Sequence, residues 1–200
     1  MAWFTTNWLR VLVHGSGAGS LLWLVAVYMF GLAPLPDRAV MLQSGTYGLI
    51  FLIAALACTP IRRWIFPPVI HVRRALGLYG VAHCCIHLAV YAIAENGLSL
   101  ELILRDLEER RAMPIGLVAL VLLIPLAITS TSGWQRRLGR RWKQLHRLFY
   151  LAMPLAVWHY LWLDRDLLTA PIVYGLIVAL LLLLRLIPPA RPSHPSRSSQ

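Results

Sequence analysis

The sequence predicts an all-α integral membrane protein, a bundle of six transmembrane helices. Of its 200 residues, 58% are hydrophobic and only 14% are charged. The apolar residues come in runs of roughly 16 to 22, which is the length that an α-helix needs to cross a bilayer. The longest connection between these runs, residues 95–112, is short and charged, which excludes a Rossmann unit, a phosphate-binding loop or another nucleotide-binding domain there.

The first three spans are expected at residues 10–32, 40–59 and 75–94. The first run is too long for the apolar region of a cleavable signal peptide and includes the sequence HGSGAGS, so we expect it to remain as a helix. The third span has Gly77 and Gly80 about one turn apart. Small residues there permit the close approach of another helix, which is the favoured interpretation, or of a flat macrocycle.

The last three spans are expected at residues 113–130, 146–163 and 170–187. Pro125 and Pro154 interrupt the fourth and fifth spans, which is tolerated where neighbouring helices or a cofactor fill the gap. Residues 1–187 therefore form one transmembrane domain. The tail, residues 188–200, is rich in proline, serine and arginine and is expected to be disordered in the cytoplasm.

The formal net charge of +11 is typical of nucleic-acid-binding proteins, but the distribution of the charges indicates membrane topology instead. One set of loops and ends carries 14 of the 19 basic residues and no acidic residue, whereas the other set carries five basic residues and all eight acids. Because basic loops stay in the cytoplasm, both termini are expected to be cytoplasmic, and no nucleic-acid partner is expected. The three cysteines lie at or within spans and are interpreted as small packing residues.

Two of the histidines are expected at the same depth on parallel helices. At 1.5 Å per residue, His87 in the third span and His159 in the fifth both lie roughly 18 to 20 Å from the cytoplasmic ends of their helices. Ionisable side chains within a span are costly and mark either a helix-to-helix hydrogen bond or a functional site. Two neutral imidazoles on facing helices can supply both axial ligands of a haem iron.

The other histidines allow more than one interpretation. His83, one turn from His87, is a second ligand candidate, a hydrogen-bond partner or a packing residue, and packing or support of a ligand is favoured. His146, at the cytoplasmic boundary, either binds a second haem together with His14 or simply caps its helix. His146 and His159 cannot bind one iron, because they differ in height by about 20 Å. His71 is interpreted as solvated, and His194 lies in the tail.

Residues 134–147, WQRRLGRRWKQLHR, combine basic side chains with two tryptophans. Positive-inside topology with interfacial tryptophans explains this composition. A more specific hypothesis is that arginines here, Arg140 and Arg141 among them, bind haem propionates or a flavin phosphate, since arginine pairs bidentately with such groups.

Three segments resemble a known family. VRRALGLYGVAHCCIHLAVY (72–91), TSTSGWQRRLGRRWKQLHRLFYLAMPLAVWHYLW (129–162) and PIVYGLIVALLLLLR (171–185) are similar to the MsrQ (YedZ) family, within the ferric-reductase-like transmembrane group. The resemblance covers nearly all the chain except the tail. It implies a b-type cytochrome of the bacterial inner membrane, with one or two haem groups, and FMN or quinone as further cofactors. The family's histidines fall on His87, His146, His159 and His14, whereas His83 and His71 are outside its pattern.

The resemblance also implies the partners. Electrons would come from a cytoplasmic flavin reductase or the quinone pool and pass to MsrP, a periplasmic molybdopterin enzyme that reduces methionine sulfoxide in damaged proteins. The chain would then be an electron-transfer subunit rather than the catalytic subunit. Two alternatives are a related cytochrome that reduces a small external acceptor such as ferric iron, and a haem-free transporter or scaffold whose histidines only pack helices.

Overall fold

A computed structural model describes residues 2–163 and 169–187, with side chains from Asn7 onward, and all the regular secondary structure in these ranges is helical. The long helices are α1 (Ala2–Met29), α2 (Pro36–Trp64), α3 (Arg73–Val90), α5 (Ala112–Ile128), α8 (Phe149–Leu163) and α9 (Thr169–Leu186). Shorter helices connect them: η1 (Pro67–Val72), the π-helical η2 (Tyr91–Glu95), α4 (Leu100–Glu109), α6 (Ser132–Leu138), α7 (Arg140–Leu145) and η3 (His146–Leu148). The tail predicted at residues 188–200 lies outside the described residues.

The prediction of a multi-pass membrane protein is supported, but the described part of the structure has fewer candidate membrane spans than the six that were predicted. In the described ranges, four helical segments are long and apolar enough to cross a membrane: Asn7–Met29, Pro36–Trp64, Pro67–Glu95 and Thr169–Leu186. A fifth is possible if α4 and α5, which meet at a bend of 108°, count as one span. The expected fifth span, 146–163, divides into η3 and the 15-residue α8, which is too short to count by itself. Six spans and cytoplasmic termini stay predictions.

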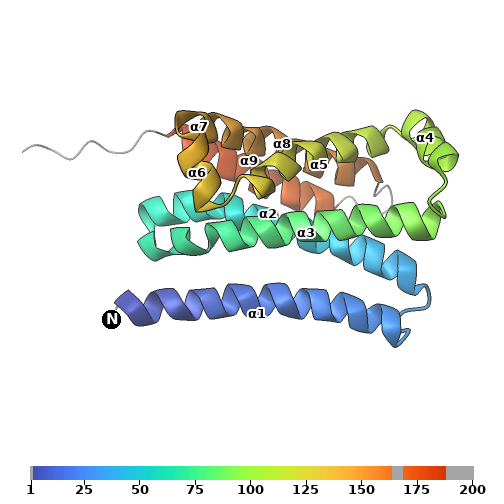
Figure 1. Cartoon of the computed structure of the whole chain (residues 1–200), viewed down its shortest axis with the longest axis horizontal. Coiled ribbons are helices and arrows are strands. Elements are labelled where there is room, and N and C mark those ends of the chain that lie inside the picture. Colours follow the sequence, from blue (N-terminus) through green and yellow to red (C-terminus); the bar gives the residue numbers. More distant parts are fainter. Residues whose placement is uncertain (1, 164–168, 188–200) are drawn as a thin grey trace, which may run out of the picture.

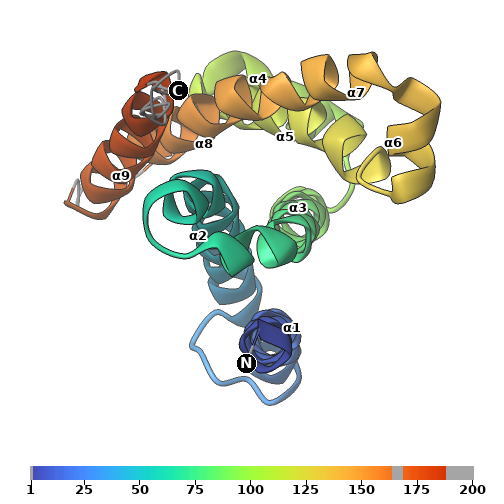
Figure 2. The same ribbon diagram turned by 90° about the vertical axis from the view of Figure 1, so that its left-hand side faces the viewer.

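The long helices run alternately up and down the bundle and form three layers. In Figure 1 the colours show α1, α3 and α8 running in one direction and α2, α5 and α9 in the other. Figure 2, nearly along the helices, shows α1 outside the central pair α2 and α3, with α5, α8 and α9 as the third layer. One end of the bundle carries α6 and α7, which we call the basic end, and the other carries α4, which we call the acidic end.

Glycines allow α2 and α3 to pack closely. A Cβ atom added at Gly80 would lie 2.7 Å from Cγ of Leu52, and one at Gly48 would lie 2.8 Å from Sγ of Cys84. Such separations are below ordinary contact, so only glycine fits these positions without displacement of a neighbour. The expected close approach of a helix is therefore confirmed at Gly80. No atom of the described residues lies within 4 Å of a Cβ atom added at Gly77, which lines a cavity instead.

Helix α4 replaces what the sequence predicted as a simple connection. Gly97 and Leu98 have positive φ values of 56° and 60° and turn the chain after η2. The Oγ atom of Ser99 then accepts a hydrogen bond from the backbone N–H of Leu102 at 3.4 Å, which caps the helix. The hydroxyl of Tyr91 donates to Asp106 at 2.6 Å and ties α4 to the start of η2. The acidic end therefore has an ordered cover.

Candidate functional site

The structure brings His87 of α3 and His159 of α8 together. Their ring centroids are 6.2 Å apart and the ring planes make an angle of 82°. Both side chains are intermediate in exposure. The equal depth predicted from the two apolar runs thus corresponds to direct proximity between the second and third layers of the bundle (Figure 2).

A hydrogen bond from α2 fixes the orientation of His87. Its Nδ1 atom lies 2.8 Å from the carbonyl oxygen of Met41. Gly45, one turn further along α2, makes room for the ring, because a Cβ atom there would lie 2.9 Å from the same Nδ1. The imidazole is therefore held between a backbone acceptor and the open side of a glycine.

His159 is held by α5 in the same way. Its Nδ1 atom lies 2.7 Å from the carbonyl oxygen of Ala112, and a Cβ atom at Gly116 would lie 2.5 Å from Nδ1. In each case a neighbouring helix supplies a carbonyl and, four residues later, a glycine. Because a carbonyl oxygen only accepts, Nδ1 carries the proton in both rings, and Nε2 keeps its lone pair. This is the tautomer of a metal-ligating histidine.

The spacing of the two rings fits a metal ion between them. An imidazole nitrogen binds a first-row metal at about 2.0 Å, and the ring centre lies roughly 1.1 Å behind that nitrogen, so two rings on opposite sides of one ion have centroids roughly 6.2 Å apart. The observed separation is 6.2 Å. The described residues contain no group of three or more His, Cys, Asp or Glu side chains suited to a metal ion. Two protein ligands suffice for iron that a porphyrin already holds, so the residues fit haem better than a bare ion.

A cavity of about 320 Å³ lies between the same helix pairs toward the basic end. Its apolar walls come from α2, α3, α5 and α8. Among the described residues its polar lining is cationic or neutral and includes no carboxylate; it comes from Arg73, Arg74, Ser130, Gln135, Trp142 and His146. A volume of this size accommodates a small ring compound, and the charges favour one with an anionic group.

His146 lies at the edge of this cavity. Its ring stacks on that of Trp142, with centroids 3.9 Å apart and an angle of 28°, and its Nδ1 atom lies 3.1 Å from the carbonyl oxygen of Trp142. The indole N–H of Trp142 in turn donates to the carbonyl of Thr129 at 2.9 Å. His146 and Trp142 thus form a stacked pair that lines the cavity, away from the site of His87 and His159.

His14 and His83 lie between α1 and α3, and neither lines the cavity. His14 is exposed, and its Nδ1 atom lies 3.2 Å from the hydroxyl of Tyr79 on α3. His83 is fully buried, stacked on Phe51 with centroids 5.6 Å apart, and its Nε2 atom lies 2.9 Å from Oγ of Ser20 on α1. The structure therefore does not bring His14 and His146 together. It buries His83 against Phe51 and Ser20, and the role of this side chain stays a prediction.

The arginines at the cavity are not the ones that sequence reasoning selected. Arg140 and Arg141 are exposed on α7, and neither lines the cavity. Arg73 and Arg74 line it instead, from the first turn of α3. The sequence contained a usable signal, since this arginine pair begins the same helix that carries His87, but a basic pair at a helix end is also what topology alone requires.

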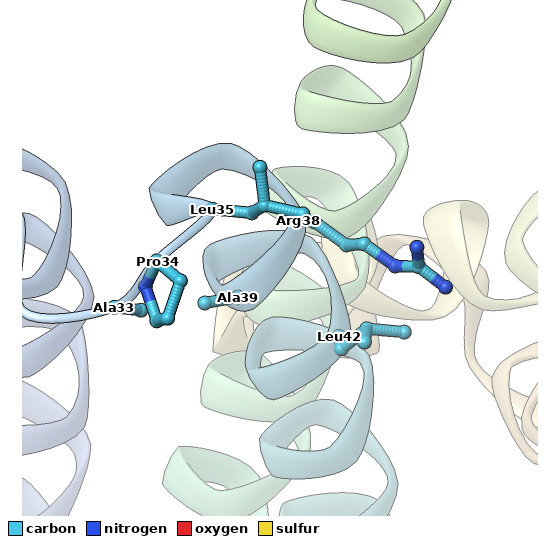
Figure 3. Close-up of a pocket in the computed structure, with 6 residues that line it drawn as sticks. All are labelled: Ala33, Pro34, Leu35, Arg38, Ala39 and Leu42. Carbon is cyan, nitrogen blue, oxygen red and sulfur yellow. The ribbon is translucent and has the colours of Figure 1, made fainter.

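A second hollow, of about 360 Å³, lies at the acidic end, where α2 begins. Figure 3 shows its lining, which is apolar except for Arg38, whose guanidinium extends past Leu42 and away from Pro34. The described residues that line it include neither a histidine nor a carboxylate, the side chains that would bind a metal there. The chemistry of the described residues is therefore concentrated between the α2–α3 and α5–α8 pairs.

Comparison with models of protein families shows which family this chain belongs to. Residues 44–157 match the model of the ferric reductase like transmembrane component, which is more than half of the chain. The protein belongs to this family. The matched segment runs from within α2 to within α8 and includes His87 and His146, whereas His14 precedes it and His159 follows it by two residues. Family membership identifies a membrane electron-transfer component.

Proposed function

We propose that the protein is a b-type cytochrome of the bacterial inner membrane, a subunit of the MsrQ kind. In this proposal it takes electrons from a cytoplasmic flavin reductase or the quinone pool. It passes them to MsrP, the periplasmic molybdopterin enzyme that reduces methionine sulfoxide in oxidised proteins. The observation that carries the proposal is the pair His87 and His159, whose ring centroids lie 6.2 Å apart and whose Nδ1 atoms each contact a backbone carbonyl, which leaves both Nε2 lone pairs for a metal.

The protein's own residues explain how such a site would be built. A haem bound there would supply a one-electron carrier, and His87 and His159 are the residues that would hold its iron. The carbonyls of Met41 and Ala112 hold the two imidazoles in the metal-binding tautomer before any metal arrives. Because these carbonyls belong to helices, the ligand geometry is preorganised, which keeps the reorganisation on each redox change small.

The cavity at the basic end is where we place the entry of electrons. Arg73 and Arg74 suit the phosphate of FMN, and the apolar walls suit either a flavin ring or a quinone head group. If the basic end is cytoplasmic, as the charge distribution predicts, this cavity is open to a reductant on that side. The acidic end, with α4, would then face the periplasmic partner. His146 and His14 are assigned no haem of their own here, because they lie in different layers.

The first test is the visible spectrum of the protein purified in mild detergent, oxidised and dithionite-reduced, with haem and protein quantified on the same sample. We expect sharp reduced α and β bands, and the loss of haem in His87→Ala and in His159→Ala. His71→Ala, at an exposed position in η1, is the matched control and should keep full haem. Full haem in either ligand variant would exclude this pairing.

Two other functions give different results. The family itself favours the first, a cytochrome that reduces a small external acceptor such as ferric iron, which would show the same spectrum but reduce ferric chelates without MsrP. A haem-free transporter or scaffold would show no Soret band even after haem-supplemented expression. Electron transfer from the reduced protein to purified MsrP, measured as haem reoxidation upon addition of methionine sulfoxide, distinguishes the proposed function from both.

A further inference from the structure

The seam between α2 and α9 at the basic end contains hydrogen-bond donors that nothing in the described residues satisfies. Within those residues, four buried side-chain polar atoms lack a partner, and three of them lie here: Oγ1 of Thr59, Nη2 of Arg63 and Nε of Arg185. Buried polar groups are normally hydrogen-bonded. Three buried polar atoms without a hydrogen-bond partner on neighbouring parts of α2 and α9 therefore indicate that a ligand binds there.

Hydrogen bonds between the two helices show that these atoms share one seam. Arg185 of α9 donates from Nη2 to the carbonyl of Leu56 on α2 at 2.7 Å, and Arg63 of α2 donates to the carbonyl of Ile187, just after α9. Leu56, Thr59 and Arg63 are spaced i, i+3 and i+7, which places them on one face of α2. Thr59 therefore lies between the two guanidinium groups along the face that contacts α9.

The chemistry of these groups specifies an anion. Each guanidinium N–H can only donate, and the threonine hydroxyl is able to donate as well. Two positive charges lie here without a carboxylate, because the six acidic residues in the described part belong to the start of α2, the end of η2 and α4, all at the acidic end (Figure 1). An oxyanion with several acceptor atoms would satisfy the donors and balance the charge.

The surroundings favour a lipid as the source of this anion. Trp64, whose ring lies 4.9 Å from the guanidinium carbon of Arg63, is exposed, as are Leu186 and Ile187 at the end of α9. Tryptophan beside arginine at a helix end is typical of the interface between lipid head groups and acyl chains. Basic pockets between membrane helices on the cytoplasmic side commonly hold anionic head groups.

We propose that the α2–α9 seam binds the phosphate head group of an anionic phospholipid, through Arg63, Arg185 and Thr59. The phosphate oxygens accept from Nη2 of Arg63, Nε of Arg185 and the hydroxyl of Thr59, and an acyl chain lies on the apolar surface beside Trp64. The bound lipid then joins the end of α9 to α2 and stabilises the third layer of the bundle. This site is separate from the cavity and from the His87–His159 pair, and it does not depend on haem.

The test is lipid retention by native mass spectrometry, with wild-type protein and the variant Arg63→Gln in detergent supplemented with phosphatidylglycerol or phosphatidylcholine. We expect wild-type protein to retain one phosphatidylglycerol per chain. Arg63→Gln should bind this lipid about tenfold more weakly or worse, as the loss of a charge-assisted hydrogen bond requires. Arg62→Gln is the matched control, because it removes the same charge at the adjacent, exposed position and should bind as wild type.

Thr59→Val gives a second measurement that keeps both charges and the side-chain shape, and we expect a loss of several-fold. Equal losses in Arg62→Gln and Arg63→Gln would show diffuse attraction to the basic end and overturn the site. Equal retention of phosphatidylcholine would do the same, since that lipid has no net charge. If inorganic phosphate competes the lipid away at millimolar concentration, the anion is free phosphate and the assignment to lipid is wrong. None of these readouts involves haem, so their failure is distinguishable from failure of the proposed function.

Discussion

Replacing Gly116 by alanine tests whether the orientation of His159 determines how much haem the site binds. In the middle of a helix this change is normally favourable, by roughly 0.5 to 1 kcal/mol, because alanine loses less backbone freedom. Here the added Cβ atom would lie 2.5 Å from Nδ1, 2.6 Å from Cε1 and 2.9 Å from Cγ of His159. Ordinary contacts begin at roughly 3.4 Å, so the ring must move by about 1 Å.

A displacement of that size breaks the hydrogen bond from Nδ1 to the carbonyl of Ala112, which is 2.7 Å long. Loss of such a bond beside a metal ligand typically lowers metal affinity by about 10- to 100-fold. We therefore expect Gly116→Ala to lower the ratio of haem to protein at limiting haem, and to shift the reduced α band of what remains. Helix α5 itself should stay intact, because the added Cβ atom is close to the side chain of His159 and alanine is favourable in a helix.

The structure supplies graded controls for this prediction. At Gly45 the added Cβ would be 2.9 Å from Nδ1 of His87 and 3.2 Å from Cε1, so Gly45→Ala should have the same effect in milder form. At Gly15 nothing lies within 4 Å in the described structure, and Gly15→Ala should keep full haem. The ratio of haem, measured by the pyridine haemochrome method, to protein, measured by amino-acid analysis, ranks the three variants. Full haem and an unchanged spectrum in Gly116→Ala would refute the claim that this glycine positions the ligand.

Two further predictions concern the attachment of α1 and of α4. Ser20→Ala removes the hydroxyl that is hydrogen-bonded to Nε2 of the fully buried His83, so thermal unfolding in detergent should show a loss of stability of about 1 to 3 kcal/mol. Ser16→Ala, at an exposed hydroxyl, should change stability little, and equal effects of the two changes would contradict a structural role for the buried hydrogen bond. Tyr91→Phe removes the 2.6 Å hydrogen bond from the tyrosine hydroxyl to Asp106, and it should increase amide hydrogen exchange in α4 but not in α3. Unchanged exchange in α4 would show that this hydrogen bond does not stabilise the helix.

The relative depth of the histidines was predictable because it depends on little besides helix geometry. The apolar runs fix where each helix lies in the bilayer, and a rise of 1.5 Å per residue then fixes the height of His87 and His159. The structure agrees, since the two rings are 6.2 Å apart. Within the one span predicted at residues 146–163, the same reasoning separated His146 from His159, and in the structure these lie in η3 and α8 and contact different neighbours.

The partners of these side chains were not predictable, because they depend on which helices pack together. Nothing local in the sequence connects Gly116 with His159 or Gly45 with His87, and a glycine in a membrane helix is common enough to carry no specific signal. Helix α4 was missed for a different reason. Its leucines and acidic residues alternate at helical spacing, but a charged connection between apolar runs is ordinarily a loop.

The two halves of the proposed electron path differ in how firmly their residues are held, and this difference has a functional consequence. The rings of His87 and His159 are each fixed by a backbone carbonyl and confined by a glycine, so they can hold one cofactor in one geometry. The cavity toward the basic end is lined by long side chains, Arg73 and Arg74, which have many rotamers and no fixed partner carboxylate in the described structure. A rigid ligand pair suits a permanently bound group, whereas an adaptable cationic cavity suits a ligand that enters, reacts and leaves. If the proposed function is right, haem should therefore stay with the protein through purification while the flavin or quinone is lost on washing.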